Sequence, residues 1–290
     1  MNKLFRYEFK RLFREKNFVV VLTILLLIGI GSAVYSIAKY LPVEQAWKSL
    51  PVDENGYFLS NQSISTYSFF NSWLGGLPTG ILPILFYTLL PIYAAIPYAT
   101  SYLEDKKSGY IRGMIAQYGR SAYYFHRFVM VFISGALIVL IPLLVNMLLT
   151  ACFIPFRMPD AIDNLYFQVY DDTIGGELFY TNPWAYDLLY LLLDAVFAGT
   201  WATVSLACSF FTDSKLLTII VPYIGLIYLS YAGDLALKLR VWMNIQPLEL
   251  IRPISVGNSE NAWVLLSEIG ILLLGALFVV YFRGKQDDVY

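Results

Sequence analysis

The chain has 290 residues, of which 58% are hydrophobic and only 14% are charged, and its mean hydropathy is +0.60. Soluble domains carry about 25% charged residues, so this chain has too few polar groups for a water-exposed surface, and we expect lipid to cover part of it. The formal net charge is -1, and nothing in the sequence points to a nucleic-acid partner. One His and two Cys are too few N and S ligands for a zinc site, so no metal site is predicted.

Residues 2–16 are predicted to form an amphipathic helix. Apolar side chains recur at helical spacing on one side, and basic ones lie on the other: Phe5, Phe9, Leu12 and Phe13 against Lys3, Arg6, Lys10 and Arg14. Such a helix lies flat in the membrane interface with its basic groups on lipid headgroups. It is either only a topology signal or an elbow that couples the first span to an intracellular partner.

Six apolar stretches follow, and a helix needs roughly 20 such residues to cross about 30 Å of hydrocarbon. We expect spans at residues 18–38, 77–103, 127–153, 184–211, 215–231 and 262–282. The second is expected to be kinked or broken, since it contains Pro78, Pro83, Pro91 and Pro97. The predicted fold is an all-α integral membrane protein with a single transmembrane domain over residues 1–290.

Residues 104–126 form a polar, basic loop between the second and third spans. A break at Ser108 and Gly109 precedes a predicted short helix over residues 110–118; Gly119 ends it, and Ser121 is expected to cap the next helix. One side of the short helix is apolar and aromatic: Tyr110, Ile111, Met114, Ile115 and Tyr118. An exposed helix of this kind suits a groove on another protein. The alternative is a solvated loop whose charges only set the topology.

Short apolar helices are also predicted between the fifth and sixth spans. Leu235, Leu239 and Trp242 follow helical spacing in a segment that we expect on the outer side, so re-entrant or interfacial helices are a natural interpretation.

Three residues inside the predicted spans are candidates for a transport pathway or a dimer seam. Asp194 lies about ten residues into the fourth span, roughly 15 Å deep, where a carboxylate must be paired, wet or protonated. The alternative role is a structural hydrogen bond to a neighbouring helix. Asn146 is a weaker candidate of the same kind, and Gly199 begins a series of small residues that permits close helix packing.

Charge asymmetry predicts the orientation. With both termini in the cytoplasm, as an even number of spans requires, the cytoplasmic segments hold most of the 20 Lys and Arg residues. Basic short loops stay in the cytoplasm, so the chain is expected to be a multi-pass protein of the plasma membrane.

The layout resembles the permease subunits of ABC-2 type transporters. The basic amphipathic start and the six spans carry most of the resemblance over the whole chain, and the loop adds a degenerate motif: Glu104, Gly109, Ile111, Met114, Ile115, Arg120 and Ser121. Two positions depart from the family's pattern: Gly119 stands where Pro is common, and Tyr110 where Thr is common.

The resemblance implies an exporter half that works by alternating access. A coupling helix at residues Glu104, Gly109, Tyr110, Ile111, Met114, Ile115 and Tyr118 would dock on a cytosolic ATPase, and a second copy or a paralogue would complete a dimer. The chain has no P-loop motif of its own, so ATP and Mg would be bound by the partner ATPase. No catalytic residues and no cofactor are expected in this chain.

The substrate is left open among amphipathic peptides, lipids and hydrophobic drugs. The alternative to the exporter is a stand-alone protein, either a secondary transporter, which should show internal repeats, or an integral membrane enzyme.

Overall fold

The computed structural model describes residues 2–51, 54, 67–76, 80–238, 244–252 and 260–286. Those residues form helices and connecting segments, without a strand among them. The long helices are α2 (Lys16–Lys48), α6 (Arg120–Ala151), α9 (Pro183–Cys208), α10 (Lys215–Lys238) and α12 (Ala262–Gln286). The short ones are α1 (Asn2–Leu12), α3 (Ile81–Ala95), α4 (Ser101–Lys107), α5 (Tyr110–Tyr118), α7 (Asn164–Phe167), α8 (Gly176–Thr181) and α11 (Pro247–Leu250).

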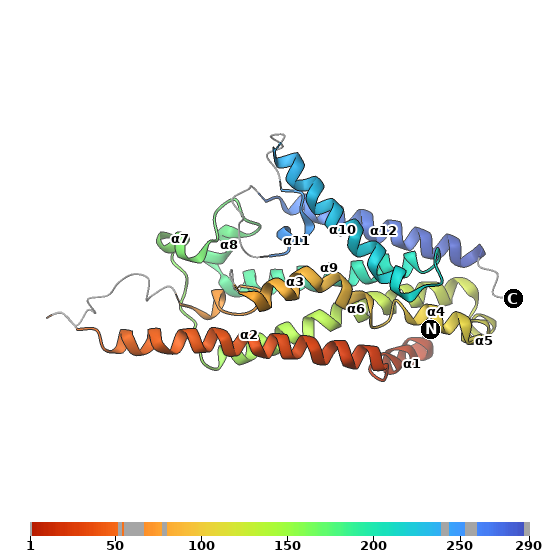
Figure 1. The fold of residues 1–290 in the computed structure, drawn as a ribbon, viewed down its shortest axis with the longest axis horizontal. Coiled ribbons are helices and arrows are strands. Elements are labelled where there is room, and N and C mark those ends of the chain that lie inside the picture. Colours follow the sequence, from red (N-terminus) through yellow and green to blue (C-terminus); the bar gives the residue numbers. More distant parts are fainter. Residues whose placement is uncertain are drawn as a thin grey trace.

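The molecule is an elongated helical bundle with two distinct ends (Figure 1). One end gathers α1, α4, α5 and the last turn of α12, and the opposite end carries α7 and α8. Five helices within the described residues are long and apolar enough to cross a membrane: α2, α6, α9, α10 and α12. Together they indicate a multi-pass membrane protein.

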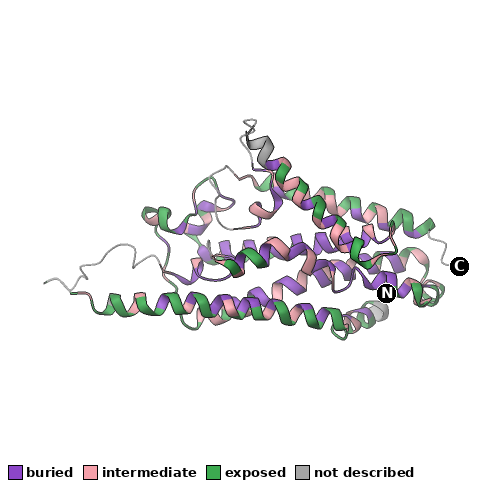
Figure 2. Ribbon diagram, viewed as in Figure 1, coloured by how far each residue is buried: buried purple, intermediate pink, exposed green. Residues whose placement is uncertain are grey.

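Burial separates central helices from peripheral ones (Figure 2). In the most apolar stretch of α9, 72% of the residues are buried within the chain, whereas the share is 22% in each of α10 and α12. The peripheral helices expose large apolar side chains such as Leu27 on α2, Tyr228 on α10 and Phe278 on α12. Contiguous apolar surface of this kind is rare on water-soluble monomers and is expected where helices contact lipid.

The second predicted span, residues 77–103, is broken. Its helix α3 covers only 15 residues, about 22 Å at 1.5 Å per residue, and turns at residues 96–100 lead into α4. Pro97 lies in these turns. Proline has no backbone N–H to donate and its ring clashes with the preceding turn of a helix, which accounts for the break. Residues 77–79 lie outside the described residues. Among the described residues, five apolar helices are long enough to cross a membrane, and α3 is a shorter apolar helix.

Several predicted boundaries shift. The N-terminal helix ends at Leu12 rather than at residue 16, and α6 begins at Arg120, seven residues before the predicted third span. Helix α10 runs past residue 231 to Lys238. The prediction that Ser121 caps α6 is wrong: the N-cap is Gly119, with φ of 84° and ψ of 150°, and Ser121 already lies inside the helix. Gly119 separates α5 from α6 without a linker, because glycine adopts positive φ at little cost.

The segment between α10 and α12 is described in part. Leu235 belongs to α10, while Leu239 and Trp242 lie outside the described residues. A one-turn helix, α11, follows at Pro247–Leu250, and its Pro247 and Leu250 are buried.

The centre of the bundle is the contact between α6 and α9. A Cβ atom added to Gly135 of α6 would lie 2.6 Å from the Cβ of Ala202 and 2.7 Å from the backbone oxygen of Ala198, both on α9. Gly199 of α9 is covered in turn by Phe132 of α6. Small residues on both helices thus let the backbones approach closely, which is how helices in membranes associate.

The end of the bundle that carries α7 and α8 is tied to the start of α12 through Glu260. The backbone N–H of Glu260 donates to the carbonyl of Asp172 at 2.8 Å, and its carboxylate accepts from the N–H of Ile174 at 3.1 Å. Burial raises the pKa of the Glu260 carboxyl to about 8, against the opposing effect of the Ile174 hydrogen bond.

Candidate functional site: a buried charge cluster

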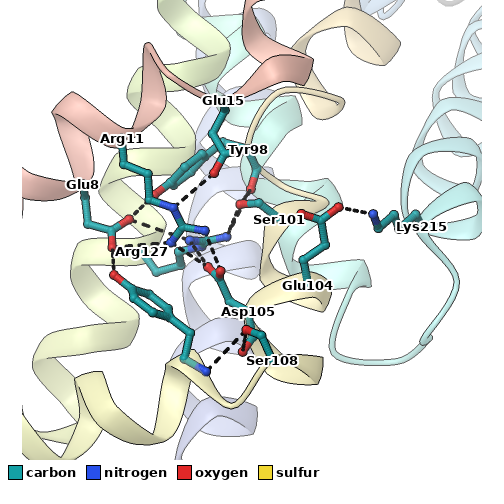
Figure 3. Close-up of polar contacts among 11 residues, drawn as sticks. Glu8, Arg11, Glu15, Tyr98, Ser101, Glu104, Asp105, Ser108, Arg127 and Lys215 are labelled. Carbon is teal, nitrogen blue, oxygen red and sulfur yellow. Dashed lines mark hydrogen bonds and ion pairs between the residues drawn. The ribbon is translucent and has the colours of Figure 1, made fainter.

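Four charged side chains from three helices meet at the end of the bundle that holds α1, α4 and α5 (Figure 3). We call Glu8 and Arg11 of α1, Asp105 of α4 and Arg127 of α6 the charge cluster. The three residues Glu8, Asp105 and Arg127 are 4% exposed or less, and the Arg11 side chain is 22% exposed. Two carboxylates balance two guanidinium groups, which is the condition for burying charge at tolerable cost.

Asp105 is the centre of the cluster. It accepts two hydrogen bonds from Arg11, at 3.1 and 2.6 Å, in a bidentate pair, and a third from Arg127 at 3.0 Å. Bidentate arginine–carboxylate pairs are strong and directional. The Asp105 carboxylate thus connects α4 to both α1 and α6, although Arg11 and Arg127 are distant from it in sequence.

Glu8 extends the cluster to α5 and to the turn before α4. The hydroxyl of Tyr110, the first residue of α5, donates to Glu8 at 2.8 Å, and the hydroxyl of Tyr98 also donates to it. Burial, followed by the negative charge of Glu8, raises the pKa of Tyr110, so its hydroxyl stays protonated and remains a donor. Glu8 lies 3.9 Å from guanidinium nitrogens of both Arg11 and Arg127.

The two tyrosine rings also contact the guanidinium groups. The Arg11 guanidinium carbon lies 4.8 Å from the Tyr110 ring centre, and that of Arg127 lies 4.3 Å from the Tyr98 ring centre. Cation–π contacts contribute about 0.5–1 kcal/mol at exposed sites and about 2 kcal/mol where water is excluded. The cluster thus connects α1, α4, α5 and α6 through buried ion pairs, hydrogen bonds and cation–π contacts. Among the described residues, no group of three His, Cys, Asp or Glu side chains could hold a metal ion.

The structure corrects the expected exposure of the short helix α5. Its apolar face turns into the bundle: Ile111 is fully buried, and Met114 and Ile115 pack against the core. The side chains that face outward are instead those of Arg112, Ala116 and Gln117. Any partner of α5 would therefore meet a small, polar surface and not the predicted aromatic one.

The other residues predicted for docking lie around α5. Gly109 precedes the helix with φ of 74°, a conformation that favours glycine, and Tyr118 ends it half-buried. Glu104 is exposed on α4 and forms an ion pair with Lys215, the first residue of α10. Exposed pairs contribute roughly 0–1 kcal/mol, so this contact is weak beside that of the neighbouring Asp105.

The three candidates for a pathway or dimer seam lie inside the chain. Asp194 is fully buried and accepts a hydrogen bond from the Tyr87 hydroxyl at 2.9 Å. Asn146 is fully buried too: its side chain donates to the carbonyl of Gly29 at 2.8 Å and accepts from the N–H of Leu74 at 2.7 Å. Asp194 therefore faces the interior of the bundle, and its carboxylate is paired with a neighbouring helix, as its depth in the span requires. Since this chain itself encloses Asp194, Asn146 and Gly199, they do not form a surface seam.

Sequence reasoning missed the charge cluster. In the sequence, Arg11 and Arg127 are two of the many basic residues in the predicted cytoplasmic segments, and no motif gives Glu8 or Asp105 a role. Two signals were present in the sequence: Glu8 is an acidic residue within a basic helix, and Asp105 lies two residues after the end of an apolar stretch. Neither signal identifies a partner, because the partners lie 94 and 22 positions away from Asp105.

A scan against protein-family models finds no matching family, and searches of curated proteins and of solved structures find no match either.

Proposed function

We propose that this protein is the membrane-spanning permease subunit of an ATP-driven ABC exporter. It would supply half of a translocation pathway, with a second copy or a paralogue supplying the other half. A cytosolic ATPase would bind ATP and Mg and dock on the end of the bundle that carries α5.

One observation carries this proposal: a short helix with a polar outer side is fastened to the bundle by a buried charge cluster. Helix α5 reaches Glu8 through Tyr110, and Glu8 in turn lies beside Arg127 at the start of the long helix α6. A push on α5 would therefore be passed to α1, α4 and α6 as a unit. A loop that only set topology would not need Ile111 and the charge cluster to hold it in place.

The proposal places the α1–α5 end in the cytoplasm and both termini with it. The basic residues of α1 support this side, because they would lie against anionic headgroups. The shorter helix α3, with its flanking turns, would act as the sixth membrane-crossing segment in a plasma-membrane protein. Helix α1 would lie in the interface, and α11 would close the outer end of the pathway.

The substrate class that fits best is amphipathic or hydrophobic: a peptide, a lipid or a drug. Support comes from the apolar surfaces of α10 and α12, along which such a molecule could reach the bundle from the bilayer. The transport step would be alternating access, with closure of the ATPase pair moving α5 and thereby rocking α6 against its neighbours.

The deciding experiment is gentle affinity purification of the tagged chain from its native membrane, followed by mass spectrometry. We expect a stoichiometric soluble ATPase with a P-loop, together with a second permease if the dimer is heteromeric. Recovery of the chain without any ATPase, under conditions that keep a known ABC complex intact, would favour a self-contained transporter or enzyme instead.

A matched pair of variants then tests the docking surface. Arg112→Glu combined with Gln117→Glu changes only outward side chains of α5 and should lower recovery of the ATPase about tenfold, a loss of about 1.4 kcal/mol. Arg283→Glu changes an exposed cation in the last turn of α12, a helix whose end lies near α5, and should leave recovery unchanged. Equal recovery with both variants would place the ATPase elsewhere.

A further inference from the structure

A cavity of about 330 Å³ opens between α10 and the segment around α11. Its wall on α10 includes Ser230 and Tyr231, and its opposite wall includes Gln246, Glu249 and Arg252. Since one water occupies about 30 Å³ of liquid, the cavity has room for about ten water-sized groups, and it falls within the usual range of ligand pockets.

A cation and an anion face this cavity from a single turn of chain. The backbone N–H of Arg252 donates to the carbonyl of Glu249 at 2.9 Å, which fixes the two residues on one side of the turn after α11. The carboxylate of Glu249 accepts from Asn244 at 3.0 Å through one oxygen. Its other oxygen receives no hydrogen bond from any described residue.

Arg252 has unused capacity as a donor. None of the ion pairs among the described residues includes it, and its Nε is buried without a hydrogen-bond partner. Its guanidinium carbon lies 5.4 Å from the ring centre of Tyr87, whose hydroxyl donates to Asp194. A half-buried guanidinium without an acceptor among the described residues indicates that a ligand supplies one, because leaving charged donors unpaired is costly.

The cavity adjoins an exposed apolar stripe on α10. Ile224, Tyr228 and Tyr231 recur one helical turn apart and are 59%, 76% and 70% exposed. Tyr231 belongs to both the stripe and the cavity wall. A ligand with a polar head in the cavity would therefore have a surface along which an acyl chain can lie.

We propose that this cavity binds the headgroup of a phosphatidylethanolamine lipid, with the phosphate on Arg252 and the amine on Glu249. Two N–H groups of Arg252 match two phosphate oxygens in a bidentate pair. The primary ammonium donates to the free oxygen of Glu249. One acyl chain follows Ile224 and Tyr228 into the bilayer.

This headgroup fits better than the other common ones for a chemical reason. A fully methylated amine, as in phosphatidylcholine, has no N–H to donate to Glu249. Phosphatidylglycerol has no cation at all, so it would place a net negative charge beside Glu249 without a group that can pair with it. The pair of opposite charges on one wall therefore selects a zwitterion with a primary amine.

The test is native mass spectrometry of the full-length chain in detergent, equilibrated with equal amounts of the three lipids. We expect at least about tenfold greater retention of phosphatidylethanolamine than of the others, about 1.4 kcal/mol. Stepwise methylation of the amine should lower retention at each step, and this series needs no variant of the protein.

Two substitutions assign the contacts. Arg252→Gln should lower retention of phosphatidylethanolamine about tenfold, and Glu249→Gln should abolish the preference over phosphatidylcholine. The control is Arg283→Gln, which removes a guanidinium that stacks on Phe211 at 5.0 Å, away from the cavity, and should change nothing. Equal retention of the three lipids by the unaltered protein, or full retention by the Arg252→Gln variant, would refute the proposal. No ATPase is needed, so either result is independent of the exporter proposal.

Discussion

Asp105 is the residue whose loss should most weaken the end of the bundle around α5. Asp105→Asn preserves the shape of the side chain but removes a charge that accepts three hydrogen bonds from two guanidinium groups. The remaining cluster of Glu8, Arg11 and Arg127 would carry one uncompensated positive charge. Removing one member of a buried ion pair costs about 3–5 kcal/mol. We expect about 3 kcal/mol here, because Arg11 keeps a hydrogen bond to Glu15 at 3.1 Å.

The measurement is reversible unfolding in mixed micelles, followed through the fluorescence of the six tryptophans. The neighbouring carboxylate provides the control: Glu104→Gln removes an exposed ion pair with Lys215 and should cost less than about 1 kcal/mol. If Asp105→Asn proves as mild as Glu104→Gln, the charge cluster does not hold these helices together.

A double-variant cycle tests whether charge balance is the cause. Combining Asp105→Asn with Arg127→Gln leaves one cation and one anion, Arg11 and Glu8, so the double variant should be more stable than the sum of the single effects predicts. Residues in contact commonly show coupling of roughly 0.5–3 kcal/mol. Additive effects would mean that the two side chains act independently.

Three further predictions concern other parts of the chain. Ile111→Ala should lower the free energy of unfolding by about 2–5 kcal/mol in the same assay, because the side chain is fully buried. Gln117→Ala, on the outward side of α5, should change it by no more than about 0.5 kcal/mol. Similar changes for both variants would contradict the inward packing of Ile111. Gly135→Leu should destabilise the protein by about 1–3 kcal/mol or more, since even a Cβ atom at this position would lie 2.6 Å from the Cβ of Ala202. The control, Gly113→Ala, adds a methyl group in open space and should be neutral or stabilising. A protein that tolerates the leucine would contradict the close contact between α6 and α9. The pKa of Glu260 is raised to about 8 from 4.5, so the folded protein binds this proton more tightly than the unfolded chain. The resulting contribution to the free energy of unfolding is full below pH 4.5 and is lost as the pH rises to about 8. Melting curves from about pH 4 to about pH 9 should show this loss of stability in the unaltered protein and not in Glu260→Gln, and matching profiles would exclude Glu260 as the cause.

The amino-acid sequence alone determined that the chain is helical and belongs in a membrane. Apolar stretches about 20 residues long and a low content of charge leave few other solutions, because lipid offers no hydrogen bonds to an unpaired backbone. It also located α5, since glycines stand at both of its ends, and the proline-induced break after α3. These features are local: each follows from a few consecutive residues.

The tertiary structure decided which faces are buried and which charges meet. Helical spacing placed Ile111, Met114 and Ile115 on one side of α5, but spacing is the same whether that side meets the chain's own core or another protein. Likewise, Asp105 and Arg11 are 94 positions apart, and no pattern along the chain brings them together. Their pairing depends on α1, α4 and α6 lying close together in the folded chain. Only there do the ion pairs and hydrogen bonds form that offset the desolvation penalty of burying these charges.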